Sequence, residues 1–177
     1  SSPIPTAGAD ILLGTAQSDL LDGLDGNDSL LGLGGNDTLV GGPGVDTLAG
    51  GTGDDQYVVD TVGDSVQESA DAGTDQVLVV LPAGSVYALP ADVEDASANP
   101  GPVSIHLLGN ALPNRLTGNA AANTLTGGAG ADTLAGGDGD DTYIVDDPGD
   151  VVNETATVGG GKDYVRVVGP AGGSYAM

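Results

Sequence analysis

The sequence lacks cysteine, tryptophan and phenylalanine, and it holds only three basic residues among 177. Without cysteine, no disulfide can staple the fold and no thiolate can serve as a nucleophile or metal ligand. Because aromatic residues make up only 3% of the chain, a core has to be built in thin layers from Leu, Val, Ile and Ala. These absences predict a fold that depends on something other than disulfides or one large core.

Basic residues are also scarce relative to acidic ones. Arg115, Lys162 and Arg166 face 26 acidic residues, which gives a formal net charge of -23. Nucleic acid and anionic membranes are therefore poor partners, whereas cations are favoured. The 39% hydrophobic content argues against a disordered acidic tail, since such tails are poor in apolar residues.

Long hydrophobic runs are missing as well. The longest, residues 77–81, is far too short to span a bilayer. Residues 1–10 have neither a basic start nor an apolar stretch, so they do not resemble a targeting segment. We expect the chain to be part of a longer protein or a processed segment.

Glycine and aspartate are abundant, and they follow a nine-residue spacing. The first series of aspartates consists of Asp10, Asp19, Asp28, Asp37, Asp46 and Asp55. A large apolar residue follows each by two positions, and a glycine usually precedes it by two. The spacing restarts at Asn114 and Asn123 and continues through Asp132 and Asp141. A fixed period of this kind is the signature of a repeat architecture.

The nine-residue repeats belong to a longer segment that is itself duplicated. Residues 54–60 match residues 140–146, and the match continues through Glu68 and Glu154. We expect a first array with its flanking segment at residues 8–75 and a second at residues 109–168. Residues 76–108 contain runs of alternating apolar and polar residues that are separated by prolines. These runs predict connecting β-strands.

A nonapeptide has room for one tight loop and one short strand, so a single repeat cannot close a core and many must stack. If two repeats form one coil, like loops recur every eighteen residues and their aspartates form columns. Stacked strands lie about 4.8 Å apart, and two carboxylates at about 5 Å repel by about 1 kcal/mol in water or about 3 kcal/mol at a dielectric constant of 20. Calcium accepts six to eight oxygen ligands in flexible geometry, and it suits such columns better than magnesium does.

The segment Gly-Gly-Ala-Gly-Ala-Asp at residues 127–132 resembles the RTX (repeats-in-toxin) nonapeptide, and the resemblance extends over residues 8 to about 165. It implies an all-β fold: a parallel β-roll (β-solenoid) of Gly/Asp-rich nonapeptide repeats, in two arrays joined by further short strands. It also implies several calcium ions, each held between a loop and the loop eighteen residues on.

The resemblance further implies which residues bind the ions, namely the motif aspartates and the glycine two residues before them. The aspartates are Asp10, Asp19, Asp28, Asp37, Asp46, Asp55, Asp132 and Asp141, with Asp64 and Asp150 as a continuation of the spacing. The glycines are Gly26, Gly35, Gly44, Gly53, Gly130 and Gly139. Loops with Asn114 and Asn123 depart from the motif, and we expect them to bind weakly or not at all.

Catalytic motifs are absent. The single histidine, His106, cannot supply the histidine pair of a zinc protease. No G-x-S-x-G turn or EF-hand loop is present. We expect His106 to be an ordinary strand residue and the chain not to be an enzyme.

Two functions are compatible with these features. RTX proteins are typically exported by type I secretion and fold where calcium is millimolar, so the first is a secreted or cell-surface module acting as a structural, spacer or adhesive element. Its partners would be calcium, the rest of a parent protein and further copies of itself. The alternative is a polysaccharide-binding module of an extracellular enzyme. It requires the three basic residues to share a face with tyrosines, which are Tyr57, Tyr87, Tyr143, Tyr164 and Tyr175.

Overall fold

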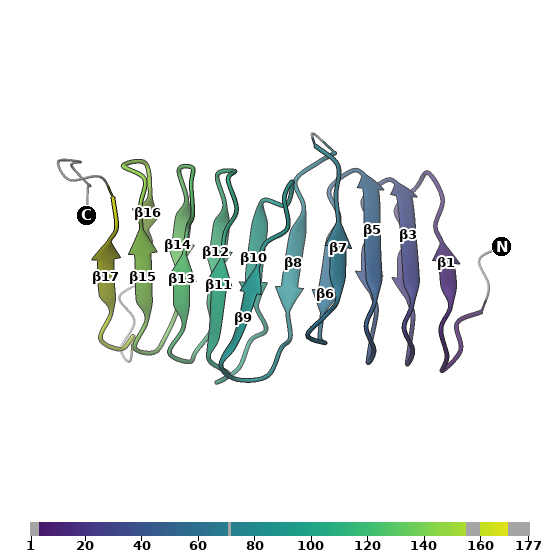
Figure 1. Ribbon diagram of the computed structural model, residues 1–177, viewed down its shortest axis with the longest axis horizontal. Coiled ribbons are helices and arrows are strands. Elements are labelled where there is room, and N and C mark those ends of the chain that lie inside the picture. The colour runs from purple at the N-terminus through teal and green to yellow at the C-terminus, as the bar shows by residue number, and fades with distance from the viewer. Residues whose placement is uncertain (1–3, 71, 155–159, 170–177) are drawn as a thin grey trace. The chain divides into compact units, whose positions relative to one another are not determined.

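The structure is a computed structural model that describes residues 4–70, 72–154 and 160–169. All regular elements in these residues are short β-strands, and none is a helix. It follows that no helix in the described part of the chain could cross a membrane. The chain divides into two compact units, Ser1–Leu81 and Pro82–Met177, and each forms parallel sheets from strands that alternate along the sequence (Figure 1).

Unit 1 contains two rows of four strands. One row pairs in the order β1-β3-β5-β7 and the other in the order β2-β4-β6-β8, with every pair parallel. The strands are β1 (Ile11–Leu13), β2 (Leu20–Asp22), β3 (Ser29–Gly34), β4 (Thr38–Val40), β5 (Thr47–Thr52), β6 (Gln56–Val59), β7 (Ser65–Gln67) and β8 (Gln76–Val79).

Unit 2 repeats this plan with one more strand. Here β9-β11-β13-β15-β17 form one row and β10-β12-β14-β16 the other, and the pairs within each row are again parallel. The strands are β9 (Ser85–Ala88), β10 (Asp95–Ala98), β11 (Ile105–Leu108), β12 (Arg115–Thr117), β13 (Thr124–Thr126), β14 (Thr133–Ala135), β15 (Thr142–Val145), β16 (Val151–Val152) and β17 (Tyr164–Val167).

Strand register follows the repeat. Leu12 pairs with Leu30, and Leu21 pairs with Leu39, so two nonapeptides make one coil. This confirms the parallel β-roll and the eighteen-residue spacing of like loops. Some coils are longer. Tyr57 pairs with Val77, and Tyr143 pairs with Val165, because residues are inserted after β7 and β16. The β9–β11 and β10–β12 pairs also lie twenty residues apart.

The core of each unit is a row of apolar side chains, one from each repeat. Leu30, Leu39 and Leu48 are fully buried, as are Leu116, Leu125 and Leu134. Tyr57 and Tyr143 take the leucine position in the next repeat. Each phenol oxygen accepts a hydrogen bond from a buried backbone N–H, of Gly50 and Gly136 respectively. The leucine rows are thus structural, as the repeat predicts.

Glycine two residues before the aspartate is required by both conformation and packing. Gly44 has a φ of 152°, and an added Cβ would collide with the carbonyl group of Gly26 in the preceding coil. The other five predicted loop glycines share a positive φ and a similarly close backbone neighbour: Gly26, Gly35, Gly53, Gly130 and Gly139. Only glycine tolerates both constraints, so these positions allow the loops to stack.

Candidate metal centre

The motif aspartates join successive coils through one carboxylate oxygen. The backbone N–H of Asp10 donates to Oδ1 of Asp28 at 2.7 Å, and the N–H of Asp28 donates to Oδ1 of Asp46 at 2.7 Å. The same bond links Asp19 to Asp37 and Asp37 to Asp55 in the other column. In unit 2, Asp132 and Asp141 receive it from Asn114 and Asn123. Like loops therefore stack eighteen residues apart, as expected.

The second oxygen of six of these carboxylates has no partner. Oδ2 is buried and receives no hydrogen bond in Asp28, Asp37, Asp46, Asp55, Asp132 and Asp141. Their side chains are only 1–3% exposed. A buried, unsatisfied carboxylate oxygen is strongly unfavourable unless a positive charge or a donor faces it. These six atoms are the strongest sign of a ligand in the molecule.

Another oxygen lies close to some of these atoms. An added Cβ at Gly23 would collide with Oδ2 of Asp28 and lie 2.7 Å from the carbonyl oxygen of Gly41. An added Cβ at Gly32 would likewise collide with Oδ2 of Asp37 and lie 2.6 Å from the carbonyl oxygen of Gly50. A carboxylate from one loop and a carbonyl from the next therefore meet at one place, which only glycine leaves open.

Four predicted ligands have a different arrangement. Oδ2 of Asp10 accepts hydrogen bonds from the N–H and hydroxyl of Thr6, and Oδ2 of Asp19 accepts the same pair from Thr15. Oδ2 of Asp64 and of Asp150 accepts backbone N–H groups three and four residues earlier in its own loop. We call these four loops closed, and the six with an unpartnered Oδ2 open.

The residue four positions before the aspartate separates the two classes. In every open loop it has a positive φ, from 69° to 108°, and these residues are Leu24, Leu33, Gly42, Gly51, Gly128 and Gly137. In the closed loops this residue has no positive φ and its N–H donates to the carboxylate. Sequence reasoning did not identify this position. In four open loops this position is the second glycine of a Gly-Gly pair, which was the available signal. In the other two it is Leu24 or Leu33, so the sequence does not show that all six share a positive φ.

The asparagine loops satisfy themselves. Oδ1 of Asn114 accepts the N–H of Asn110, and its amide donates to the carbonyl groups of Val93 and Glu94. The Asn123 amide donates to the carbonyl of Ala121 at 2.6 Å. Since neither side chain has a buried unpartnered oxygen, these loops present nothing that requires a cation.

Burial raises the pKa of five column carboxyl groups. It is the main cause of the raised pKa of Asp37, Asp46, Asp55 and Asp141, and it raises the pKa of Asp132 to about 6. Neighbouring carboxylates add to this effect, with Asp150 beside Asp132 as an example. The ionised columns are thus held in surroundings that disfavour their charge.

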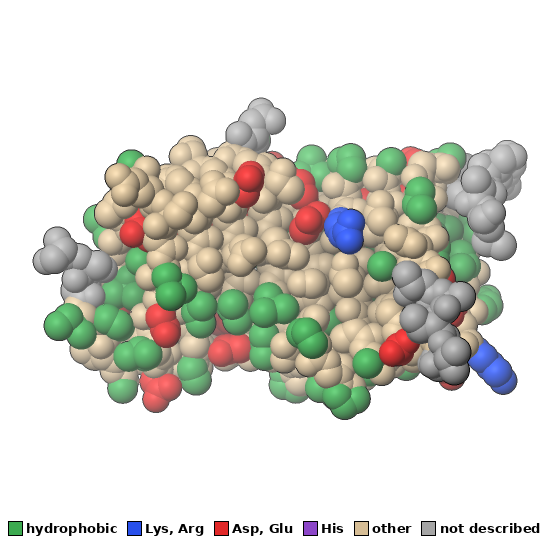
Figure 2. Space-filling model, turned by 180° about the vertical axis from the view of Figure 1, so that it is seen from behind, with side chains coloured by type: hydrophobic (Ala, Val, Ile, Leu, Met, Phe, Trp, Pro, Cys, Tyr) green, Lys and Arg blue, Asp and Glu red, His purple; other side chains and the backbone are tan. Residues whose placement is uncertain are grey.

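Side-chain cations cannot neutralise the columns. Residues 1–81 contain no Lys or Arg, so unit 1 has no basic side chain at all. Figure 2 shows acidic side chains at several places on one face, whereas basic ones are sparse there. The positive charge that the loops of unit 1 require must therefore come from outside that unit.

Three further acidic groups lie beside the columns. Carboxylate oxygens approach within 4.8 Å of one another in Asp55–Glu68–Asp75, Asp141–Glu154–Asp163 and Asp132–Asp146–Asp150. Of these, sequence reasoning had proposed only the aspartates on the nine-residue spacing. Glu68 and Glu154 occupy equivalent positions in the longer duplication, and this equivalence was the sequence signal that could have identified them as candidate ligands.

The donor set fits calcium. The loops offer carboxylate and carbonyl oxygens, and the chain has no cysteine. Hard oxygen donors in several loops of similar shape suit calcium, which tolerates irregular coordination. A bound ion would supply positive charge to the buried Oδ2 atoms and would bridge neighbouring loops.

Comparison with known families gives an independent result. The family model described as RTX calcium-binding nonapeptide repeat matches residues 5–39, 22–57 and 108–143, which together span half of the chain. All six open loops lie within these matches. No curated protein matches the sequence.

Proposed function

Because the chain belongs to the RTX calcium-binding nonapeptide repeat family, we propose that its calcium ions are held by the six open loops and that they make the roll stable. The supporting observation is the set of six buried Oδ2 atoms without a partner. Binding free energy at such sites is also folding free energy, because the unfolded chain cannot assemble them.

The open loops are unevenly distributed. Four belong to unit 1, at residues 23–28, 32–37, 41–46 and 50–55, and two belong to unit 2, at residues 127–132 and 136–141. We therefore propose that unit 1 holds more ions than unit 2. The aspartates of the closed loops would coordinate an ion only where the ion displaces their local hydrogen bonds. These are Asp10, Asp19, Asp64 and Asp150.

At the level of the cell, we propose a secreted or surface-exposed module that is unstructured where calcium is scarce and folds where it is millimolar. In this role the chain is a structural, spacer or adhesive part of a larger protein and is not itself an enzyme. The high negative charge supports this role, because it opposes compaction until cations bind.

Far-UV circular dichroism tests the proposal. The chain freed of divalent ions at pH 7.5 should show little β-structure, and millimolar calcium should restore a strong β signal. Magnesium at the same concentration should restore much less, because it demands an octahedral shell and retains its waters. A full β signal in excess chelator at this pH would refute calcium-dependent folding.

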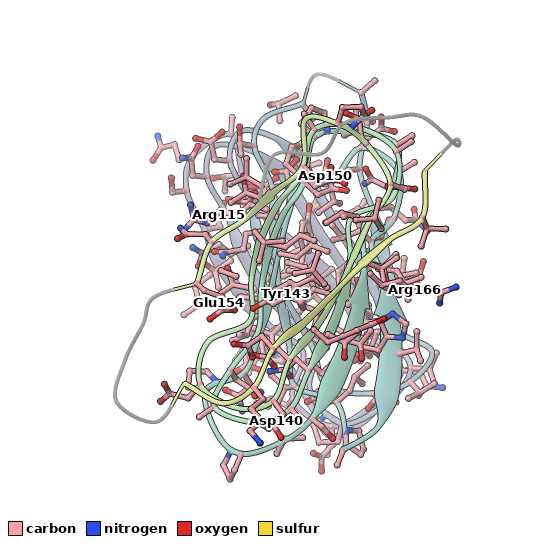
Figure 3. The ribbon with its side chains drawn as sticks, turned by 90° about the vertical axis from the view of Figure 1, so that its left-hand side faces the viewer. Arg115, Asp140, Tyr143, Asp150, Glu154 and Arg166 are labelled. Carbon is pink, nitrogen blue, oxygen red and sulfur yellow. The ribbon has the colours of Figure 1, made fainter. Side chains whose placement is uncertain are left out.

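Polysaccharide binding receives less support from the geometry. Tyr164 is 63% exposed and shares the outer face of β17 with Arg166, but Arg115 belongs to β12 in the other row of strands. Figure 3 shows Arg115 and Arg166 on opposite sides of unit 2. Tyr57 and Tyr143 are buried, and Tyr175 lies outside the described residues. The basic residues therefore form no single stripe for a polyanion.

A further inference from the structure

Glutamate is rare in this chain, and its positions are informative. The 26 acidic residues include only three glutamates: Glu68, Glu94 and Glu154. Ala49 pairs with Gln67, so Glu68 takes the register position of Gly50 in the next coil. Leu134 pairs with Val152, so Glu154 takes the register position of Gly136. Both units thus place a glutamate where the repeat has the glycine that lies against Oδ2.

The glutamate of unit 1 lies in a tight acidic group. Oxygens of Asp55, Glu68 and Asp75 lie within 4.8 Å of one another. Oδ2 of Asp55 is buried without a partner in a side chain that is 1% exposed, and Oε1 of Glu68 is also buried without a partner. Two unsatisfied oxygens from different loops therefore meet in one group.

Unit 2 has a similar group, in which Asp141 is buried and both Glu154 and Asp163 are exposed. Oxygens of Asp141, Glu154 and Asp163 lie within 4.8 Å of one another, and Oδ2 of Asp141 is buried without a partner. In Figure 3, Glu154 lies near Tyr143, whereas Arg166 points away from the body of the unit. The recurrence of the group in both units argues against a chance cluster of acidic residues.

The loop that follows each glutamate continues the column in spite of its extra length. The N–H of Asp55 donates to Oδ1 of Asp75, twenty residues on, at 2.8 Å. The N–H of Asp141 donates to Oδ1 of Asp163, twenty-two residues on, at 3.0 Å. Since loops of the nonapeptide arrays recur every eighteen residues, the inserted residues lengthen each coil in which a glutamate replaces glycine without breaking its column.

We propose that Asp55, Glu68 and Asp75 form a calcium site that terminates one column of unit 1, and that Asp141, Glu154 and Asp163 form its equivalent in unit 2. This inference rests on the proposed calcium-dependent folding. Among the described residues, the open loops of Asp55 and Asp141 differ from the other three open loops of unit 1 because three side-chain carboxylates would surround the ion there. A higher ligand charge strengthens calcium binding, so these ions should be the last to leave as free calcium falls.

Calcium binding by the full chain and three matched variants tests the proposal. Equilibrium dialysis over a range of free calcium gives the number of ions and their affinities. Glu68→Gln and Glu154→Gln should each weaken one ion at least tenfold or lose it, and the double variant should affect two. Glu94→Gln makes the same chemical change outside the acidic groups found among the described residues, so it should bind as the wild type does.

Terbium gives a second measurement that does not depend on counting ions. The Tyr57 hydroxyl and Oδ2 of Asp55 both lie against Gly50, so Tyr57 should sensitise terbium at the unit 1 site. Glu68→Gln should reduce tyrosine-sensitised emission, and Glu68→Asp should restore part of it. If Glu68→Gln fails to fold in calcium, Glu68→Gly takes its place, because it restores the residue of the ordinary repeat.

The outcomes separate the two proposals. Failure of the wild-type chain to bind calcium would overturn the proposed function. Wild-type binding together with unchanged ion number, affinities and terbium emission in the glutamate variants would overturn only the terminal sites. If Glu94→Gln lost as much calcium binding as Glu68→Gln and Glu154→Gln, the terminal sites would also be overturned. The loss would then depend on net charge and not on the position of the glutamate.

Discussion

Each open-loop aspartate has two separate tasks. Oδ1 accepts the N–H of the residue eighteen positions earlier and so fixes the stacking of the coils, whereas Oδ2 has no partner in the chain. An amide at the same position can perform the first task, as Asn123 does by accepting the N–H of Ile105. The second task requires a carboxylate, because an amide brings no charge to neutralise a cation.

This division predicts different effects at two aspartates. Oδ1 of Asp37 accepts the N–H of Asp19, and its unpartnered Oδ2 lies against Gly32, so Asp37→Ala removes both the bond to the preceding coil and the carboxylate of an open loop. It should lower the free energy of unfolding in saturating calcium by about 2 kcal/mol, since the part-buried N–H of Asp19 is left unpaired. Asp10 accepts bonds only from Thr6 among the described contacts, so Asp10→Ala should cost about 1 kcal/mol or less.

Calcium titrations followed by circular dichroism compare these variants. Asp37→Ala should raise the calcium midpoint more than Asp10→Ala and should lower the cooperativity. Asp37→Asn is the matched control: it should be milder, because the amide oxygen can still accept the N–H of Asp19. Equal midpoints for the two alanine variants would show that loops eighteen residues apart do not share ions.

At the scale of elements, the strands were predictable and the loop classes were not. The spacing of leucine and aspartate was sufficient to predict parallel strands with Leu12 beside Leu30. It could not separate open from closed loops, because that depends on the backbone of one residue. Leu24 and Leu33 adopt a positive φ, which costs a non-glycine residue about 1–2 kcal/mol, so their sequence gives no warning of it.

A closed loop should become open when two glycines are restored. In loop 14–19, the N–H and hydroxyl of Thr15 hold Oδ2 of Asp19. Thr15→Gly with Gln17→Gly gives Gly-Gly-Ala-Gly-Ser-Asp, which closely matches residues 127–132. Glycine allows the positive φ that turns the N–H away, so the double variant should bind one additional calcium ion in equilibrium dialysis.

The control for this experiment is Gln17→Gly alone, which leaves Thr15 and its hydrogen bonds in place. It should bind the same number of ions as the wild type. An unchanged ion number in the double variant would show that the residue four positions before the aspartate does not decide whether a loop binds calcium.

For the whole molecule, protonation of buried carboxylates at low pH should stabilise the fold in part as calcium does. Burial and then Asp75 raise the pKa of Glu68 to about 7, and burial raises the pKa of Asp132 to about 6. Carboxyl groups in the unfolded chain titrate near 4. The calcium-free fold therefore binds more protons than the unfolded chain, so its stability is greatest below pH 4–5 and is lost as the pH rises through 6 and 7.

Circular dichroism of the chain in metal-free buffer should accordingly show more β-structure at pH 5 than at pH 8. In saturating calcium the difference between the two pH values should be small, since the ions neutralise the same carboxylates. Less β-structure at pH 5 than at pH 8 in metal-free buffer would contradict the proposed role of charge in keeping the chain unfolded.

The bond between a backbone N–H and Oδ1 of the next coil also gives the roll a direction. The linked aspartates of unit 1 present carboxylate acceptors toward the preceding coil and N–H donors toward the following one. Two acceptor ends would repel each other, and two donor ends could not pair. A contact that repeats these bonds between two copies of the unit is therefore head-to-tail, and such a heterologous contact grows into an open filament because it does not close as a two-fold dimer does.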